Sequence, residues 1–154
     1  MKIDARLVEK RIKEFTDLCQ QNRIKVTKQR IEVLIEVLRC NDHPDAEKVF
    51  TGLRKKMPKI SLDTVYRTLW LLNDLGVITT FGFSREKTRF EANLKPHHHF
   101  ICRQCGLAVD FFCDEMSRLE LPQQVRSLGK IDRTQVEVTG ICNNCAKSVK
   151  NKTK

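Results

Sequence analysis

The sequence lacks several features that would place the protein in a membrane, in an export pathway or among nucleotide-binding enzymes. No apolar run approaches the roughly 20 residues that a helix needs to cross a bilayer, so no membrane partner is expected. The start, MKIDARLVEKRIKEF, is charged throughout and does not resemble a signal peptide. A Gly-rich phosphate loop and an internal repeat are also absent. These absences predict a globular, cytoplasmic protein.

The composition allows a folded chain with a basic surface. A length of 154 residues fits one ordinary domain or two small ones, and 40% hydrophobic residues are enough to build a core in each. The formal net charge is +10, from 29 Lys and Arg against 19 Asp and Glu. Such an excess favours a polyanionic partner, because Lys and Arg gain affinity for phosphates by releasing counterions. Solvated lysines are the alternative, and composition alone does not separate the two.

Cysteine spacing gives the strongest chemical signal in the sequence. A reducing compartment disfavours a disulfide framework for the 7 cysteines, so Cys-x-x-Cys spacing indicates metal binding or redox chemistry. Four thiolates at strand ends form a closed tetrahedral zinc site. The predicted structural Zn(II) ligands are Cys102, Cys105, Cys142 and Cys145. A thioredoxin-like redox pair lacks the expected strand-to-helix context and leaves the second pair unexplained. The core or surface thiols are expected to be Cys19, Cys40 and Cys113.

The first 91 residues are expected to form helices followed by a β-hairpin. After a first helix, apolar residues recur at helical spacing in three segments, the second of them from about Asp45 to Lys56. Thr27 and Ser61 are the expected N-caps of the first and third segments, and Gly76 is expected just past the end of the third. VITTFGFSREKTRFE indicates two short strands around a charged turn. Three helices and a hairpin are the order of a winged helix, whose third helix enters the DNA major groove.

The residues after Pro96 are expected to form strands joined by cysteine turns. HHHFICRQCGLAVDFF indicates two strands, and IDRTQVEVTGIC a third. A short helix is expected to begin at Pro122 and to reach Leu128. The predicted fold class is therefore α+β. The predicted organisation is a winged-helix DNA-binding domain over 1–91, a linker over 92–96, a small α/β domain with the zinc site over 97–147 and a disordered basic tail over 148–154.

Three of the 4 histidines stand together, from His97 to His99. Side chains alternate along a strand, so His97 and His99 share one face and His98 points to the other. This pair needs further ligands, and the nearest carboxylates lie in the strands on either side. The candidate ligands are His43, Glu91, His97, His99 and Asp110. A sulfur-free set of this kind suits Fe(II) or Mn(II), with Zn(II) as a competitor. A solvated histidine run and an isolated helix-entry histidine are the alternatives.

Five segments occur in the order and spacing of one known family, over nearly the whole chain. They are HPDAEKVF, TVYRTLWLLNDLGVI, TRFE, HHHFICRQCG and GICNNC. In these segments the sequence resembles the Fur (ferric uptake regulator) family of dimeric metalloregulators. The resemblance implies a repressor with an N-terminal winged-helix domain that binds double-stranded operator DNA and a C-terminal α/β dimerisation domain. It also implies a sensing metal at the hinge between the domains and a structural zinc in the second.

The resemblance indicates which residues would bind the metal and which would contact the DNA. By position, the hinge site would be the five candidate ligands given above. A metal there would fix the angle between the domains, so metal-free protein is expected to bind its operator poorly, and linkage requires that DNA tighten metal binding. Thr64, Tyr66 and Arg67 match the recognition surface, where Arg67 would contact a guanine edge or phosphate and Tyr66 a thymine methyl. Lys25 matches a basic residue near the minor groove.

Some members of the family hold a third metal. At the matching positions this sequence has Pro96, His98, Ser117 and Thr134. Three of these are poor ligands, so no third site is expected, and His98 is expected to be exposed.

The signal that the protein senses is left open between two branches of the family. The iron branch favours glutamates among the ligands and the peroxide branch aspartates, whereas this sequence has both Glu91 and Asp110. A zinc-uptake branch commonly has cysteine in place of Glu91, which argues against it. Asp110, the segment PHHHFICRQCG and the expected absence of a third metal site favour a peroxide sensor. In that branch Fe(II) reduces hydrogen peroxide and a ligand histidine is oxidised, here His43 or His97 by position, which releases the operator. Iron-responsive repression is the alternative.

Two other classes of function are the alternatives to a transcription regulator. A metalloenzyme would use the His and carboxylate cluster to activate water, but five protein ligands leave little room for a substrate, so the protein is predicted not to be an enzyme. A thiol switch would oxidise the four cysteines and lose zinc as DNA affinity falls.

Overall fold

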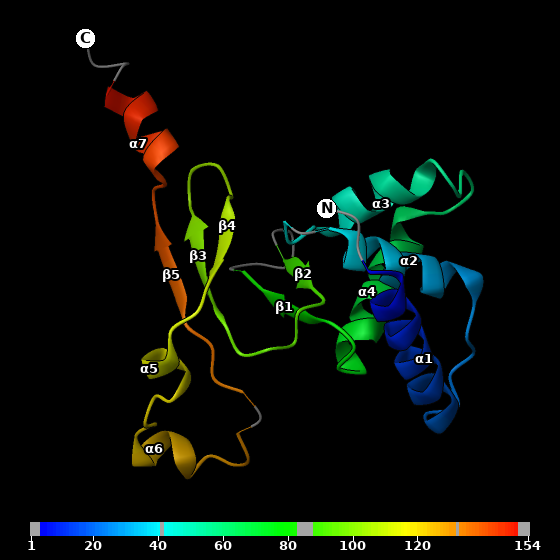
Figure 1. The fold of residues 1–154 in the computed structure, drawn as a ribbon, viewed down its shortest axis with the longest axis horizontal. Helices are drawn as coiled ribbons and strands as arrows, with labels where there is room; N and C mark the ends of the chain where they lie inside the picture. The colour runs from blue at the N-terminus through cyan, green and yellow to red at the C-terminus, as the bar shows by residue number, and fades with distance from the viewer. Residues whose placement is uncertain (1–3, 41, 83–87, 132, 151–154) are drawn as a thin grey trace. The chain divides into compact units, whose positions relative to one another are not determined.

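The computed structural model describes residues 4–40, 42–82, 88–131 and 133–150, which form two compact units, Met1–Leu94 and Lys95–Lys154 (Figure 1). The division falls inside the segment 92–96 that was predicted as a linker. Of the helices in the described ranges, none is both long and apolar enough to cross a membrane.

The first unit contains helices followed by a two-stranded antiparallel sheet. Its elements are α1 (Ala5–Gln21), α2 (Lys28–Arg39), α3 (Ala46–Arg54), α4 (Leu62–Asp74), β1 (Thr79–Phe81) and β2 (Arg89–Glu91). Thr27 and Ser61 cap α2 and α4 as predicted, because their hydroxyls accept hydrogen bonds from the N–H groups of Arg30 and Thr64. Gly76 follows α4 with a φ of 67°, the left-handed conformation that favours glycine. Residues 83–87 of the predicted hairpin turn lie outside the described residues.

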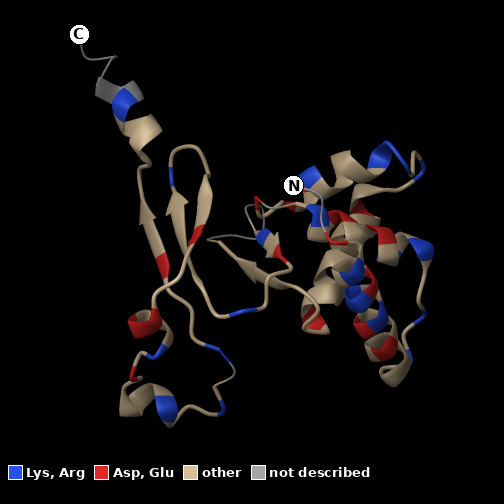
Figure 2. Ribbon diagram, viewed as in Figure 1, with Lys and Arg blue, Asp and Glu red and all other residues tan. Residues whose placement is uncertain are grey.

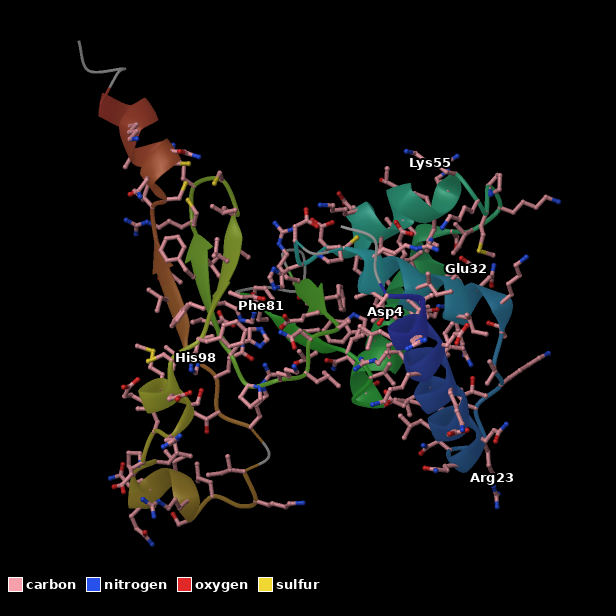
Figure 3. All side chains as sticks on the ribbon, viewed as in Figure 1. Asp4, Arg23, Glu32, Lys55, Phe81 and His98 are labelled. Atoms are coloured by element: carbon pink, nitrogen blue, oxygen red, sulfur yellow. The ribbon has the colours of Figure 1, made fainter. Side chains whose placement is uncertain are left out.

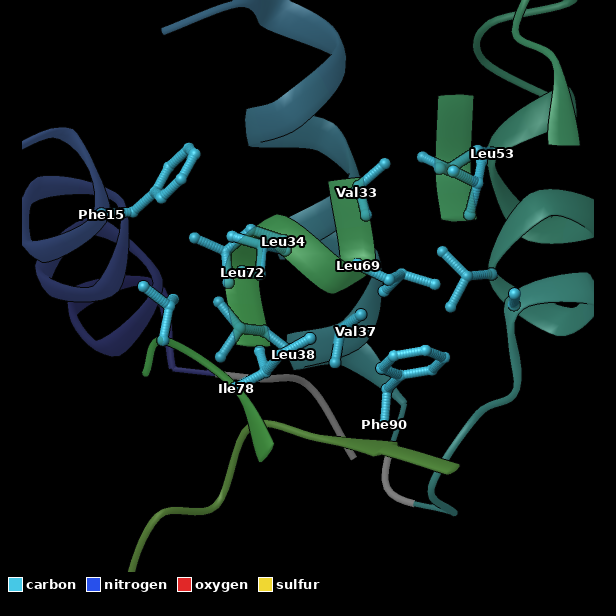
Figure 4. Packing of buried hydrophobic residues seen from close by; sticks show 14 of the residues in the cluster. Phe15, Val33, Leu34, Val37, Leu38, Leu53, Leu69, Leu72, Ile78 and Phe90 are labelled. Carbon is cyan, nitrogen blue, oxygen red and sulfur yellow. The ribbon is translucent and has the colours of Figure 1, made fainter. Parts of the chain in front are cut away.

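The core of the first unit is apolar and centred on α2 (Figure 4). Residues on two adjacent rows of α2 are buried, because α1, α3 and α4 all contact this helix. Apolar residues at positions i, i+3, i+4 and i+7, counted from Ile31, indicate a narrower buried stripe that includes Ile35, yet Ile31 and Ile35 are only partly buried. The fully covered positions of α2 instead include Val33 and Val37. A helix covered on several sides therefore buries a broader face than one apolar stripe indicates.

The first helix belongs to this core. Phe15 and Cys19 of α1 are fully buried. The Arg11 guanidinium donates a hydrogen bond to the Val77 carbonyl just before β1, and burial lowers the pKa of Arg11. The extra N-terminal helix therefore packs on the helical bundle and is tied to the entry of the hairpin.

The second unit is built on a three-stranded sheet in the order β4-β3-β5. Its elements are β3 (His98–Cys102), β4 (Ala108–Phe111), α5 (Asp114–Ser117), α6 (Gln123–Arg126), β5 (Glu137–Gly140) and α7 (Asn143–Lys150). β3 pairs antiparallel with β4 and parallel with β5, so the segment between β4 and β5 must cross over, and it carries α5 and α6.

Three boundaries in this unit differ from those expected. The last strand begins only at Glu137, and the helix expected to reach Leu128 ends at Arg126. The tail predicted to be disordered from residue 148 is helical in its backbone as far as Lys150, because α7 continues that far. Residues 151–154 of that tail lie outside the described residues.

Candidate metal centres

The four predicted zinc ligands meet at one end of the sheet in the second unit. β3 and β5 run parallel, with Cys102 opposite Gly140, so the turns that follow both strands lie side by side. Cys105 lies in the turn after β3, and Cys142 follows β5. Cys145 lies in the first turn of α7. The parallel pairing is therefore what brings two distant Cys-x-x-Cys pairs together.

The geometry of the sulfurs fits a tetrahedral ion. The four Sγ atoms lie within 4.8 Å of one another, and the Sγ atoms of Cys105 and Cys142 are 3.8 Å apart. A tetrahedral zinc with Zn–S bonds of about 2.3 Å would place its sulfurs about 3.8 Å apart. The Cys142 N–H donates to Cys102 Sγ at 3.3 Å, which lowers the pKa of Cys102 to about 6. Hydrogen bonding of its thiol to the sulfurs of Cys142 and Cys105 raises the pKa of Cys145 to about 12. This cluster suits structural Zn(II).

A histidine and a carboxylate lie together in the first unit. His43 precedes α3, and its Nε2 lies 3.3 Å from Oε1 of Glu91 in β2. Two hydrogen bonds to backbone carbonyls fix this approach, since the Phe90 N–H donates to the Pro44 carbonyl at 2.9 Å and the Arg89 guanidinium donates to the His43 carbonyl at 3.4 Å. The loop before α3 is thus fastened along β2.

The backbone of His43 adopts an unusual conformation. Its φ is 50°, a left-handed value that is costly for a residue with a Cβ atom. The imidazole is buried and meets the Phe81 ring edge-on, with ring centroids 5.0 Å apart. Because the surroundings hold an unfavourable backbone conformation in place, the position of this side chain is strongly specified.

A second cluster, made of His97, His99 and Asp110, lies on one face of the sheet in the second unit. The two Nε2 atoms are 3.0 Å apart, and Oδ1 of Asp110 lies 3.3 Å from Nε2 of His99 and 3.8 Å from that of His97. The register explains this arrangement, because His99 in β3 lies directly opposite Asp110 in β4. Both histidines are fully buried. As predicted from strand alternation, His97 and His99 share a face.

The outward ring nitrogens of these histidines are also engaged. Nδ1 of His97 lies 2.6 Å from the Lys95 carbonyl oxygen, and Nδ1 of His99 lies 2.7 Å from Nε2 of Gln135. The Nε2 atoms and the carboxylate therefore converge on one point, with no sulfur among them, and this donor set fits Fe(II), Mn(II) or Zn(II). The sequence had not indicated Gln135, because nothing in its local pattern distinguishes it from an ordinary strand residue.

His98 is buried, and the expectation that it would be exposed is wrong. Its Nε2 lies 3.2 Å from the Cys113 carbonyl and 3.2 Å from the Ser117 hydroxyl, and its Nδ1 accepts from the Val136 N–H at 3.3 Å. Figure 3 labels His98 in the second unit. The chain after β4 returns across this face of β3 and covers the ring. His98 thus joins β3 to two distant segments of the same unit.

Three of the four predicted DNA-contact residues, Thr64, Tyr66 and Arg67, lie on α4 in the first unit. Arg67 is exposed, and its Nε donates to Oδ2 of Asp63 at 2.8 Å. This pairing lowers the pKa of Asp63 and raises that of Arg67. The Thr64 hydroxyl lies 2.8 Å from the Ser61 hydroxyl, within the helix cap. Tyr66 is half-buried against the core, and Lys25 is exposed before α2.

Comparison with known proteins identifies the family to which this chain belongs. Residues 21–139 match the model of the ferric uptake regulator family. The peroxide-responsive repressor PerR of Staphylococcus aureus is 28% identical over 145 residues, which cover 94% of this chain and 98% of the relative.

Solved structures agree in fold over most of the chain. The Helicobacter pylori ferric uptake regulator Fur, described as having three functional metal binding sites, gives a TM-score of 0.76 at 25% identity, covering 95% of this chain and 97% of that one. Fur of Vibrio cholerae gives 0.62 at 27% identity, covering 80% and 96%. Since the matching family model spans residues 21–139, most of the sequence, the chain belongs to the ferric uptake regulator family.

Proposed function

We propose that this protein is a dimeric, cytoplasmic, metal-dependent repressor that releases its operator DNA when hydrogen peroxide oxidises a ligand histidine. Its family consists of transcription regulators and not of enzymes, which leaves the metalloenzyme alternative without support. One observation carries the proposal. Each unit holds an incomplete, sulfur-free set of ligands, His43 with Glu91 in the first and His97 with His99 and Asp110 in the second.

One regulatory ion, Fe(II) or Mn(II), is proposed to be held by both sets together. Two or three ligands are too few to bind such an ion tightly, whereas five from both units would nearly complete its coordination. The two units would then be held at one angle, which sets the spacing of the two α4 helices in a dimer. Protein without the ion would sample other angles and bind DNA weakly, and DNA would in turn tighten metal binding.

The proposed signal is peroxide. When bound, Fe(II) would activate hydrogen peroxide by giving it one electron. Overall, the peroxide would transfer one oxygen atom to His43 or His97 and leave as water, so that the histidine is oxidised by two electrons and loses its place in the site. Asp110 and the name of the Staphylococcus aureus relative support this reading. Glu91 and the likeness to two Fur structures support the alternative, a repressor that reports iron availability.

The proposed DNA surface is centred on α4. Arg67 is exposed there and would contact a guanine edge or a phosphate, with Thr64 and Tyr66 beside it and Lys25 near the minor groove. Figure 2 shows Lys and Arg residues in the turn between α3 and α4. The exposed lysines of this turn are Lys55, Lys56 and Lys59. They would add phosphate contacts that carry no sequence information.

The proposed dimer face lies on the sheet of the second unit. Phe100, Val109 and Val138 stand side by side across the three strands. Val109 is 45% exposed and Val138 39% exposed. A groove beside them is lined in part by Leu107 and Ile141. A continuous apolar row on a small unit favours burial against a second copy of the chain.

The deciding experiment is operator binding by zinc-loaded protein, titrated anaerobically with Fe(II) and separately with Mn(II), before and after one pulse of hydrogen peroxide. A peroxide sensor would lose DNA only in the Fe(II) form, and a peptide containing His43 or His97 would gain the mass of one oxygen atom. If both forms keep their DNA, the protein reports metal availability. Loss of zinc together with loss of DNA would instead indicate a thiol switch.

A matched pair of variants tests the ligand set. His97→Ala should abolish metal-dependent operator binding and leave zinc content and fold intact. His98→Gln, one residue along the strand, should keep metal dependence, because His98 lies on the opposite face. Metal dependence that survives in His97→Ala would refute the proposed site.

A further inference from the structure

Asp63 and Arg67 form an ion pair on the exposed side of α4. Nε of Arg67 donates to Oδ2 of Asp63 at 2.8 Å, and Nη2 of Arg67 donates to the same oxygen. The two residues are one helical turn apart, so their side chains lie on the same side of the helix. Asp63 is 66% exposed and Arg67 80% exposed, whereas the buried residues Val65 and Leu69 lie on the opposite side. Both members of the pair are therefore available to a partner.

The place of this pair in α4 suits contact with DNA bases. In helix-turn-helix proteins the N-terminal residues of the recognition helix contact the base edges. Asp63 and Arg67 are the charged residues in the first two turns of α4. The Thr64 hydroxyl lies 2.8 Å from that of Ser61 within the helix cap, and Tyr66 packs partly against the core. Asp63 and Arg67 are therefore the charged groups that this end of the helix presents to DNA.

The hydrogen bonds to Asp63 use one edge of the Arg67 guanidinium and leave another. A guanidinium has five N–H donors in a rigid plane. Asp63 takes the side edge, formed by Nε and one N–H of Nη2. The end edge keeps one N–H on Nη1 and one on Nη2, which point in parallel. Two parallel donors match O6 and N7 of guanine, which face the major groove together.

The charge of Asp63 disfavours a phosphate as the partner of Arg67. A carboxylate beside the guanidinium offsets its positive charge and repels the anionic DNA backbone, whereas a guanine edge carries no net charge. An exposed pair of this kind adds little to the stability of the free protein, because water screens it. DNA would exclude that water and strengthen the interaction. The main effect of the pair is therefore expected in the complex with DNA.

We propose that Asp63 is a positioning residue for DNA specificity, which holds the Arg67 guanidinium for a bidentate contact with guanine and keeps it from phosphates. In each half of the operator, one guanine is then read by the end edge of Arg67. This inference rests on the proposed function, because it requires α4 to enter the major groove of operator DNA. It narrows the partner of Arg67 from a guanine edge or a phosphate to the guanine edge alone.

Four variants separate the contributions of the pair. Asp63→Ala removes both the acceptor and the negative charge. Asp63→Asn removes the charge but keeps an oxygen that can accept from Nε of Arg67. Arg67→Ala removes the group that reads the base. Asp74→Ala is the matched control, because Asp74 is also exposed and acidic but lies at the other end of α4, roughly 16 Å away along the helix axis.

The first measurement is the base preference of zinc-loaded protein with Mn(II) bound. Duplexes with a randomised centre are selected on the parent protein and sequenced, and affinities are then measured for the preferred duplex and for copies with single base changes. Replacing the guanine that Arg67 reads should weaken parent binding about 5- to 150-fold. Asp63→Ala and Arg67→Ala should lose this preference at that one position, and Asp63→Asn should keep part of it. Asp74→Ala should match the parent.

The second measurement is the salt dependence of binding to a duplex of equal length that lacks the preferred sequence. The slope of log affinity against log salt steepens by about 0.9 for each phosphate contact. In Asp63→Ala and Asp63→Asn, Arg67 is released to contact a phosphate, so the slope for a dimer should steepen by about 1.8, from one contact in each subunit. Asp74→Ala should keep the slope of the parent. Thermal denaturation should show that every variant is folded at the temperature of the binding experiments.

Three outcomes would overturn the inference and leave the proposed function standing. One is a preferred sequence in which no guanine depends on Arg67. Another is a guanine preference that Arg67→Ala abolishes but Asp63→Ala keeps, since Arg67 would then need no positioning. The third is an equal loss at every position of the preferred sequence in Asp63→Ala, which would mean that Asp63 acts only by stabilising α4. A parent protein that selects no sequence with Mn(II) bound would overturn the proposed function together with the inference.

Discussion

The two units of this chain are held together by different kinds of interaction. The first buries a cluster of aliphatic and aromatic side chains contributed by every helix and by β2. In the second, the described residues that are buried are mainly the three adjacent histidines, with Ile101 and Cys102 as the hydrophobic ones. Most of the exposed large hydrophobic residues also belong to the second unit. The first unit is stabilised by apolar burial, whereas the second has few buried apolar side chains and is proposed to depend on hydrogen bonds, on zinc and on a partner surface.

This difference suits a protein whose second unit must respond to metal. An apolar core of the usual density resists rearrangement, whereas a sheet closed by an ion and by polar side chains changes when its ligands change. Separate substitutions can test how much zinc, the apolar core, the sheet surface and His98 each contribute.

The largest expected effect is that of zinc removal. Cys142→Ser, or chelation of the parent protein, should unfold the second unit and leave the first folded, because structural zinc contributes about 10–16 kcal/mol of apparent binding free energy in small domains. Amide hydrogen exchange, measured separately for each unit, would show that the amides of β3 and β5 lose their protection while those of α2 and α4 keep it. If the amides of the second unit stay protected without zinc, the claim that zinc stabilises this unit is wrong.

A smaller effect is expected in the apolar core. Leu69→Ala should lower the free energy of unfolding of the first unit by about 2–5 kcal/mol, since the buried side chain leaves a cavity. Leu128→Ala, at a residue that is 85% exposed, should change stability by no more than about 0.5 kcal/mol. Urea denaturation of both variants gives the comparison. Zinc content should be the same in each, and a drop in the Leu69→Ala variant would show that the units are not independently stabilised.

The apolar row on the sheet predicts an effect on assembly. Val138→Asp should weaken dimerisation by at least about 10-fold, because it places a charge in the centre of the proposed interface. Sedimentation equilibrium measures this directly. The control is Leu7→Asp, at a similarly exposed position in α1, which should leave the dimer intact. Equal dimerisation in both variants would place the interface elsewhere.

A further effect is expected at His98. His98→Ala should cost about 1–3 kcal/mol of unfolding free energy, because it leaves the Val136 N–H and the Cys113 carbonyl without their partner. An exposed histidine, as the sequence had predicted, would give almost no change. Thermal denaturation of zinc-loaded protein distinguishes the two.

Local signals in the sequence account for most of the fold. The caps at Thr27 and Ser61, the hairpin and the strands around the first cysteine pair follow from side-chain chemistry within a few residues. The zinc cluster was also predictable, because the spacing of the cysteines restricts the chemistry even before the strands are placed.

What the sequence could not show depends on segments that are distant in the chain. His98 is buried because the residues around α5 return over it, and no pattern near residue 98 encodes that return. Val33 and Val37 are buried because α2 is covered by helices on several sides. Gln135 is placed beside His99 only by the parallel approach of β5 to β3. Local periodicity does not reveal which tertiary neighbour will arrive.

The parallel pairing of β3 with β5 has a consequence for synthesis of the chain. β5, Cys142 and Cys145 come after the other strands of the sheet, so the second unit cannot complete its sheet or its cluster until the residues up to Cys145 have left the ribosome. The first unit is translated earlier and has a core of its own, so it can fold while the rest is still being made. Closing the long segment between the strands carries an entropic cost, and zinc offsets it by joining the two ends. A cell short of zinc would therefore accumulate chains with a folded first unit and an open second one.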